Sequence, residues 1–120
     1  MTGMLLISLA SLGFVSTESP ELHTAPITCT ASAPGVTFGI GSGLMCFHYN
    51  TTCDGPVESI TINASYSGPA TGSGTKTCTD TSSCAYVLCT PYRRGTWSFT
   101  NDSTYTGGVC AATNSVTYNQ

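Results

Sequence analysis

Seven cysteines in a chain of 120 residues are the feature that most limits how this protein can fold. Leu, Ile, Val and Phe provide only 15 side chains between residues 18 and 120. Burying each of these gains about 1.5–3 kcal/mol, whereas ordering every residue of the chain costs about 1.5 kcal/mol. The sequence therefore predicts a small domain that depends on about three disulfides, each worth about 2–4 kcal/mol. The cysteines are Cys29, Cys46, Cys53, Cys78, Cys84, Cys89 and Cys110.

Spacing alone does not fix how these cysteines pair. Leaving one cysteine out and pairing the other six allows about 105 arrangements. Short loops favour two pairs, Cys46–Cys53 and Cys78–Cys84, and the three remaining cysteines would then share one bridge and one free thiol. An odd cysteine in a secreted protein predicts either a free thiol or a disulfide-linked homodimer.

The N-terminus indicates the compartment. Residues 4–15 form an almost wholly apolar run of 12, too short for a membrane span of about 20 residues and typical of a secretory signal peptide. We expect a signal peptide over residues 1–17, an extended polar leader over residues 18–28 and one disulfide-rich domain over residues 29–120. No second apolar run follows, so we expect a secreted protein without a membrane span.

Three N-glycosylation sequons support secretion. They begin at Asn50, Asn63 and Asn101, and each has the Asn-x-Ser/Thr pattern of a glycan acceptor on a secreted surface. Only nine residues are charged and the net charge is −3, so the basic footprint of a nucleic-acid binder is missing. Glycans would explain how so sparsely charged a surface stays soluble.

Alternating patterns predict strands throughout the chain. Residues 36–40 alternate before a Gly-rich stretch, and residues 53–56 read as a turn because Asp-Gly and Gly-Pro both break regular structure. The clearest strand covers residues 59–66, where Ile60, Ile62, Ala64 and Tyr66 share one face. Asn63 falls on the opposite, polar face.

The C-terminal half continues the same pattern. Residues 84–89 are apolar throughout and predict a central strand buried on both faces. Cys84 and Cys89 would point to opposite faces of this strand, so they should not bond each other. Residues 95–101 point Trp97 and Phe99 inward, a turn is expected at residues 101–102, and residues 109–112 and 115–118 form the last strands. The predicted fold is all-β, a small antiparallel sandwich of six to eight short strands stapled by about three disulfides.

Residues with catalytic or metal-binding chemistry are few. Zinc-ligand residue types occur close together at Cys46, His48 and Cys53. The close Cys-x-x-Cys pair of a zinc site is absent, however, and a secretory route favours oxidation of the cysteines. No Gly-x-Ser-x-Gly elbow accompanies His48, and the acidic residues sit in or beside turns, as solvated acids do. Residues 39–43 and 68–77 imitate phosphate-binding loops without their spacing. We expect no catalytic residue, metal or cofactor.

Residues 92–97 stand out as a candidate contact surface. This segment holds two of the three basic residues and the only tryptophan, and Tyr, Trp and Arg dominate binding hot spots. The candidate binding residues are Tyr92, Arg93, Arg94 and Trp97. Two alternatives remain: a core Trp beside arginines that keep a hairpin tip soluble, and a dibasic processing site.

The C-terminal third also resembles known extracellular modules. The arrangement Cys89-x5-Gly95-x-Trp97-Ser98-x11-Cys110 resembles the closing half of a sushi (complement-control) module and is similar to the nematode six-cysteine domain. The extra cysteines depart from both patterns. The resemblance implies an extracellular, non-enzymatic module with no catalytic residue to carry over.

These observations predict a secreted, N-glycosylated, non-enzymatic binding or structural module whose partner is an extracellular protein or glycan. One alternative is a secreted effector, toxin or protease inhibitor that presents a disulfide-framed loop, because such a loop is organised before it binds. A second alternative is a small secreted hydrolase.

Overall fold

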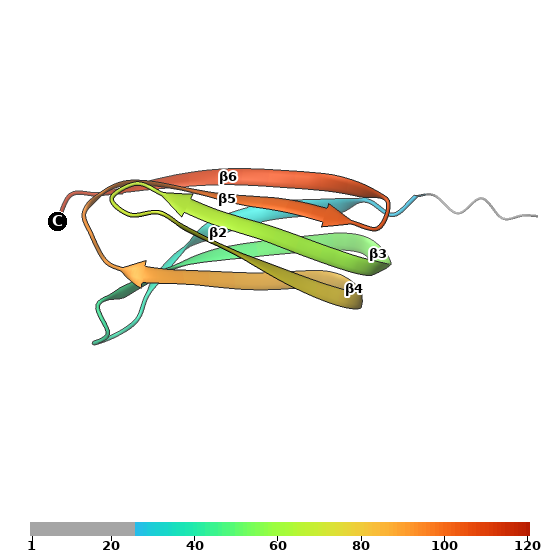
Figure 1. Cartoon of the computed structure of the whole chain (residues 1–120), viewed down its shortest axis with the longest axis horizontal. Coiled ribbons are helices and arrows are strands. Elements are labelled where there is room, and N and C mark those ends of the chain that lie inside the picture. Colours follow the sequence, from blue (N-terminus) through green and yellow to red (C-terminus); the bar gives the residue numbers. More distant parts are fainter. Residues whose placement is uncertain (1–25) are drawn as a thin grey trace, which may run out of the picture.

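The computed structural model describes residues 26–120, which form five antiparallel strands (Figure 1). The expected signal peptide and most of the expected leader lie outside the described residues. The strands are β2 (Cys29–Phe38), β3 (Leu44–Ser67), β4 (Gly72–Pro91), β5 (Gly95–Tyr105) and β6 (Gly108–Tyr118). No helix in this part of the chain could cross a membrane.

Strands β3 and β4 double back on themselves as one ribbon. Nineteen residues of straight strand would separate Phe47 from Tyr66 by about 60 Å, yet their rings stack with centroids 4.9 Å apart. The Tyr49 hydroxyl likewise donates a hydrogen bond to the Ser65 carbonyl at 2.9 Å. The fold lies where the β3–β4 register shifts, between Thr52 and Val57. The predicted turn at residues 53–56 is therefore the point at which the ribbon folds over.

The folded ribbon makes a two-layer sandwich. The first layer contains β2, the first half of β3 and the second half of β4. The second layer contains the first half of β4, the second half of β3, then β5 and β6. The predicted all-β fold class is confirmed, with five strands in place of six to eight because two of them serve both layers.

Aromatic side chains fill one half of the space between the layers. Phe47 of the first layer packs against Phe99 and Trp97 of the second, with ring centroids 4.9 and 5.6 Å apart, and all three are fully buried. The inward orientation predicted for Trp97 and Phe99 is confirmed. The predicted apolar face of β3 is also confirmed, since Ile60, Ile62 and Ala64 are buried.

Polar side chains fill part of the other half. Asn101, Thr51 and Ser103 are fully buried, and each contacts the other two through hydrogen bonds of 2.6–3.1 Å. The amide nitrogen of Asn101 also reaches the carbonyls of Ser32 and Asn50, at 3.1 and 2.8 Å. This cluster ties β5 of one layer to β2 and β3 of the other.

Three predicted details of the strands are wrong. Residues 84–89 are neither central nor buried on both faces: β4 pairs only with β3 at the edge of both layers, and one of its faces points out of the sandwich. Ala85, Val87 and Cys89 are consequently exposed. The turn expected at residues 101–102 lies instead at residues 106–107, after β5 has run on to Tyr105, and β6 is one continuous strand.

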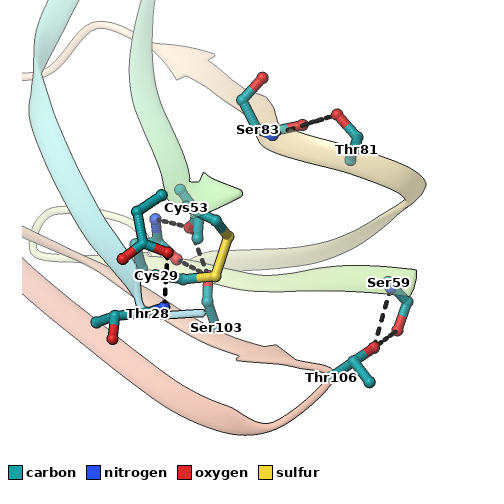
Figure 2. The surroundings of a disulfide bond; sticks show 11 residues. Thr28, Cys29, Cys53, Ser59, Thr81, Ser83, Ser103 and Thr106 are labelled. Atoms are coloured by element: carbon teal, nitrogen blue, oxygen red, sulfur yellow. Dashed lines mark hydrogen bonds between the residues drawn. A yellow bond between two sulfur atoms is a disulfide. The ribbon is translucent and has the colours of Figure 1, made fainter. Parts of the chain in front are cut away.

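The disulfides are Cys29–Cys53, Cys46–Cys89 and Cys78–Cys84, and Cys110 is free. The predicted Cys78–Cys84 pair is confirmed, because β4 doubles back between these two residues and brings their Cα atoms within 5.8 Å. The predicted Cys46–Cys53 pair is wrong. Seven residues of extended β3 separate these cysteines by about 23 Å, so each bonds a cysteine directly opposite on a neighbouring strand. Figure 2 shows Cys29–Cys53 joining β2 to β3.

Candidate binding surface

One end of the sandwich, here called the apex, carries the loop between β2 and β3. This loop, residues 39–43, projects beyond the strands at the lower left of Figure 1. Gly41 and Gly43 have φ of +75° and +73°, a conformation that only glycine adopts readily. Backbone bonds from Gly39 N–H to the Leu44 carbonyl (3.1 Å) and from Ser42 N–H to the Gly39 carbonyl (3.3 Å) close the loop. The backbone of the apex loop is therefore held in one conformation.

The apex presents apolar side chains to solvent. Ile40 is fully exposed at the tip of the loop, and Phe38 and Leu44 on either side of it are 50% and 37% exposed. Phe38 packs edge-on against Tyr92 and Tyr118, with ring centroids 5.8 and 5.4 Å apart. These aromatic contacts support the point where the loop leaves β2, whereas Ile40 at the tip stays fully exposed.

The β4–β5 connection lies beside this loop. Tyr92 N–H donates to the Gly43 carbonyl at 2.8 Å, so the two segments are held together at the apex. Arg93 and Arg94 are exposed, and the Arg93 guanidinium lies 3.4 Å from the Pro69 carbonyl. Three of the four candidate residues thus lie on one exposed surface.

Trp97 is not part of that surface. Its ring is fully buried among Phe47 and Tyr66, and its indole N–H donates to the Arg93 carbonyl at 2.9 Å. The tryptophan therefore anchors the β4–β5 connection from inside and cannot touch a partner. The alternative that placed Trp97 in the core was correct.

Sequence reasoning missed the most exposed members of the apex. Phe38 and Ile40 belonged to the alternating stretch of residues 36–40, Leu44 followed the Gly-rich stretch, and Tyr118 belonged to a terminal strand. One signal was present: Ile40 lies between two glycines in a turn-forming stretch, and such connections run over the protein surface. That they gather beside Arg93 and Arg94 depends on pairing between strands far apart in sequence.

The opposite end, here called the base, is where β3 and β4 fold over and β5 turns into β6. It carries three acidic residues, Asp54, Glu58 and Asp80, whereas the apex carries two arginines. Asp80 has φ of +51° where β4 doubles back. The described part of the molecule is thus polarised along its strands, basic at the apex and acidic at the base.

A groove of about 410 Å³ opens at the base. Its neighbourhood is braced by hydrogen bonds from Thr28 N–H to Asp54 Oδ1 (3.0 Å) and from Ser59 N–H to Thr106 Oγ1 (3.1 Å) (Figure 2). Most of the lining is apolar and Glu58 supplies the charge. The lining residues are Pro26, Ile27, Pro56, Val57, Glu58, Thr106 and Gly107.

The three sequons occupy different environments. Asn63 is exposed on the outer face of the second layer, where its side-chain oxygen accepts a bond from Thr75 (3.1 Å) that does not involve the amide nitrogen. Asn50 is half-buried on the first layer. Asn101 is fully buried, and its amide nitrogen serves the polar cluster. The prediction of a glycan on Asn101 is therefore wrong for this fold, because the modified atom would lie in the core.

The odd cysteine is a free thiol on the last strand. Cys110 is half-buried on β6, and burial raises the pKa of its thiol, although a backbone hydrogen bond with Ala31 acts in the opposite direction. A raised pKa lowers the thiolate fraction that forms disulfides at neutral pH. A disulfide-linked homodimer through Cys110 stays a prediction.

The residue set considered for zinc is dispersed. Cys46 and Cys53 belong to different disulfides. His48 forms a 2.8 Å hydrogen bond with the Thr37 hydroxyl. These residues cannot act together as ligands.

Comparisons with known proteins add one distant likeness. No protein-family model and no curated protein matches the chain. A solved structure, the CARDB domain of the PF1109 protein from Pyrococcus furiosus in complex with di-metal ions, is 14% identical with a TM-score of 0.44. That match covers 85% of this chain and 97% of the other. The CARDB domain is a β-domain too, and no functional conclusion follows from the match.

Proposed function

We propose that this protein is a secreted, N-glycosylated, non-enzymatic module that binds an extracellular partner through its apex. The observation that carries the proposal is Ile40, a fully exposed isoleucine on a loop whose backbone is held by hydrogen bonds. Exposed apolar side chains on a fixed scaffold, beside arginines, are typical of contact surfaces. Preorganisation of the loop lowers the entropy cost of binding.

The extracellular setting has separate support. Three disulfides are consistent with an oxidising compartment, and an apolar run resembling a signal peptide precedes the domain. Asn63 stands exposed in the middle of the outer face of β3, away from both apex and base. A glycan there would leave both ends free.

Glycan mapping tests the setting. The protein is produced in eukaryotic cells and its intact mass is compared before and after peptide N-glycosidase. We expect Asn63→Gln to remove one glycan and Asn101→Gln to remove none. A chain that keeps residues 1–17, carries no glycan and has seven free thiols would overturn the secretory proposal.

Binding tests the role of the apex. We expect the secreted protein to bind components of an extracellular protein and glycan panel, and Ile40→Ser to weaken that binding at least tenfold. Val87→Thr is the matched control, since Val87 is an exposed apolar residue in the middle of β4. Equal binding by the wild type and Ile40→Ser would show that the apex is not the contact surface.

A protease inhibitor is the second candidate. The disulfide Cys46–Cys89 lies directly below the apex loop, two residues after Leu44, so the loop is framed as an inhibitory loop would be. Inhibition of an extracellular protease that is lost in Ile40→Ser would favour this candidate over an adhesive or structural role.

A further inference from the structure

We propose that the partner of the apex is the base of a second copy of this chain, so that copies join head to tail. This inference rests on the proposed function, because it names the occupant of the same apex surface. It is carried by two features at opposite ends of the molecule that complement each other in shape and charge.

The shapes fit as a knob and a hole. Ile40 protrudes fully exposed between two glycines, whereas the base holds a groove of about 410 Å³ lined by Pro26, Ile27 and Pro56. A groove of this size can admit an apolar side chain. Insertion would remove from water both the isoleucine and the exposed prolines that flank the groove.

The charges fit in the same orientation. Arg93 and Arg94 follow Tyr92, whose N–H bonds the Gly43 carbonyl of the apex loop. Glu58 lines the groove at the base, with Asp54 close by at the fold-over. When Ile40 enters the groove, the arginines face the acidic rim. Opposite charges around an apolar contact select the partner and fix its orientation. Apex against apex would instead place four arginines together, which disfavours a two-fold dimer.

The geometry gives an open chain of copies. Apex and base differ, so the contact is heterologous, and a heterologous contact that does not close on itself propagates. The first half of β3 runs from the apex at Leu44 to the base near Asp54, a span of about 33 Å. Copies would therefore repeat along the strand direction, and Asn63 on the lateral face would keep its glycan in water.

The first experiment measures self-association of the secreted protein. Sedimentation velocity over a broad concentration range is expected to show a mass that rises with concentration. Ile40→Ser should raise the dissociation constant at least tenfold, and the control Val87→Thr should leave it unchanged. A wild type that stays monomeric up to millimolar concentration would overturn the inference.

The second experiment reverses charges at each end. Arg94→Glu and Glu58→Arg should each weaken self-association at least tenfold, because like charges then meet at every contact. In a one-to-one mixture of the two variants, the dissociation constant should return to within threefold of the wild type. The acidic apex of Arg94→Glu then meets the basic base of Glu58→Arg, and the unchanged apex and base of the two variants also match. A destabilised fold could not produce this recovery. If the mixture stays as weak as its components, the inference is wrong.

The outcomes separate this inference from the proposed function. A glycosylated protein that binds the panel through Ile40 but remains monomeric would keep the proposed function and overturn self-assembly. Binding to vesicles of anionic phospholipid, lost in Arg94→Glu without any self-association, would assign the apex to a membrane surface instead. An unprocessed, unglycosylated chain that still recovers in the mixing experiment would keep self-assembly and overturn the secretory setting.

Discussion

The apex half and the base half of the sandwich have different interiors. Toward the apex, the core contains large rings, among them Phe47, Trp97 and Phe99. Toward the base, the aliphatic side chains of Ile60 and Ile62 share the core with buried hydroxyl and amide groups. The surfaces differ in parallel, being apolar and basic at the apex and acidic at the base.

The polar core of the base half compensates an irregular strand. The β2–β3 pairing shifts register between Ser32 and Gly35, which leaves β2 carbonyls without regular partners. Asn101 donates to the Ser32 carbonyl and Asn114 donates to the Ala33 carbonyl, at 3.1 and 2.9 Å, both from the facing layer. Buried carbonyls need such donors. The comparison shows that packing stabilises one half, while hydrogen bonds between layers set the alignment of the other.

The largest expected effect is in the aromatic half. Trp97→Ala should lower the free energy of unfolding by about 3–5 kcal/mol, because it leaves a large cavity and removes the indole bond to Arg93. Chemical denaturation measures this, with Val109→Ala on the exposed outer face as the control. A loss below about 1 kcal/mol would contradict the role given to the aromatic core.

Disulfide removal should also distinguish the two halves. Cys46–Cys89 spans 43 residues and Cys78–Cys84 spans 6, for which loop entropy predicts losses of about 4 and about 2 kcal/mol. We expect the double Cys→Ser variant of the first pair to unfold at a clearly lower denaturant concentration than that of the second pair. The reverse order would show that the short bridge, which holds the β4 fold-over, matters more than chain entropy.

The stability contributed by the polar cluster should depend on the side-chain amide of Asn101. Asn101→Ala should cost about 2–3 kcal/mol, since buried carbonyls lose their donor, whereas Asn63→Ala at the exposed sequon should cost little. Thermal unfolding of the two variants, both without glycans, gives the comparison. Similar melting temperatures for both would mean that the buried network does not stabilise the base half.

The smallest effect concerns Cys110. Because burial raises the pKa of this thiol, its protonated form is favoured in the folded state, and the associated stabilisation is lost only as pH rises through the raised pKa. At pH 8 the thiol should react more slowly with iodoacetamide in the native protein than in denaturant. Equal rates would indicate that Cys110 is freely exposed.

Several features could be predicted because they depend on neighbours in sequence. The inward face of Ile60, Ile62 and Ala64 follows from a two-residue period, and so does the orientation of Trp97 and Phe99. The Cys78–Cys84 bridge follows from a short loop. A break in regular structure at residues 53–56 was visible in the Asp-Gly and Gly-Pro steps.

The features that failed depend on partners distant in sequence. Residues 84–89 look like a central, buried strand because they are apolar, yet β4 lies at an edge and its outer face is not covered by another layer. Asn101 looks like a surface sequon because asparagine favours turns, yet the Ser32 and Asn50 carbonyls of the other layer hold it in the core. Neither fact has a local signal.

The sequence by itself determined an all-β, disulfide-stapled domain, since cysteine content, scarce aliphatic residues and alternating periodicity are properties of composition and spacing. Only the tertiary structure decided that β3 and β4 fold over as a ribbon, that Cys46 bonds Cys89, and that the β2–β3 loop is hydrogen-bonded to the β4–β5 connection. The physical reason is that cross-strand pairing joins residues across tens of positions, and the register of that pairing is chosen by the whole core at once.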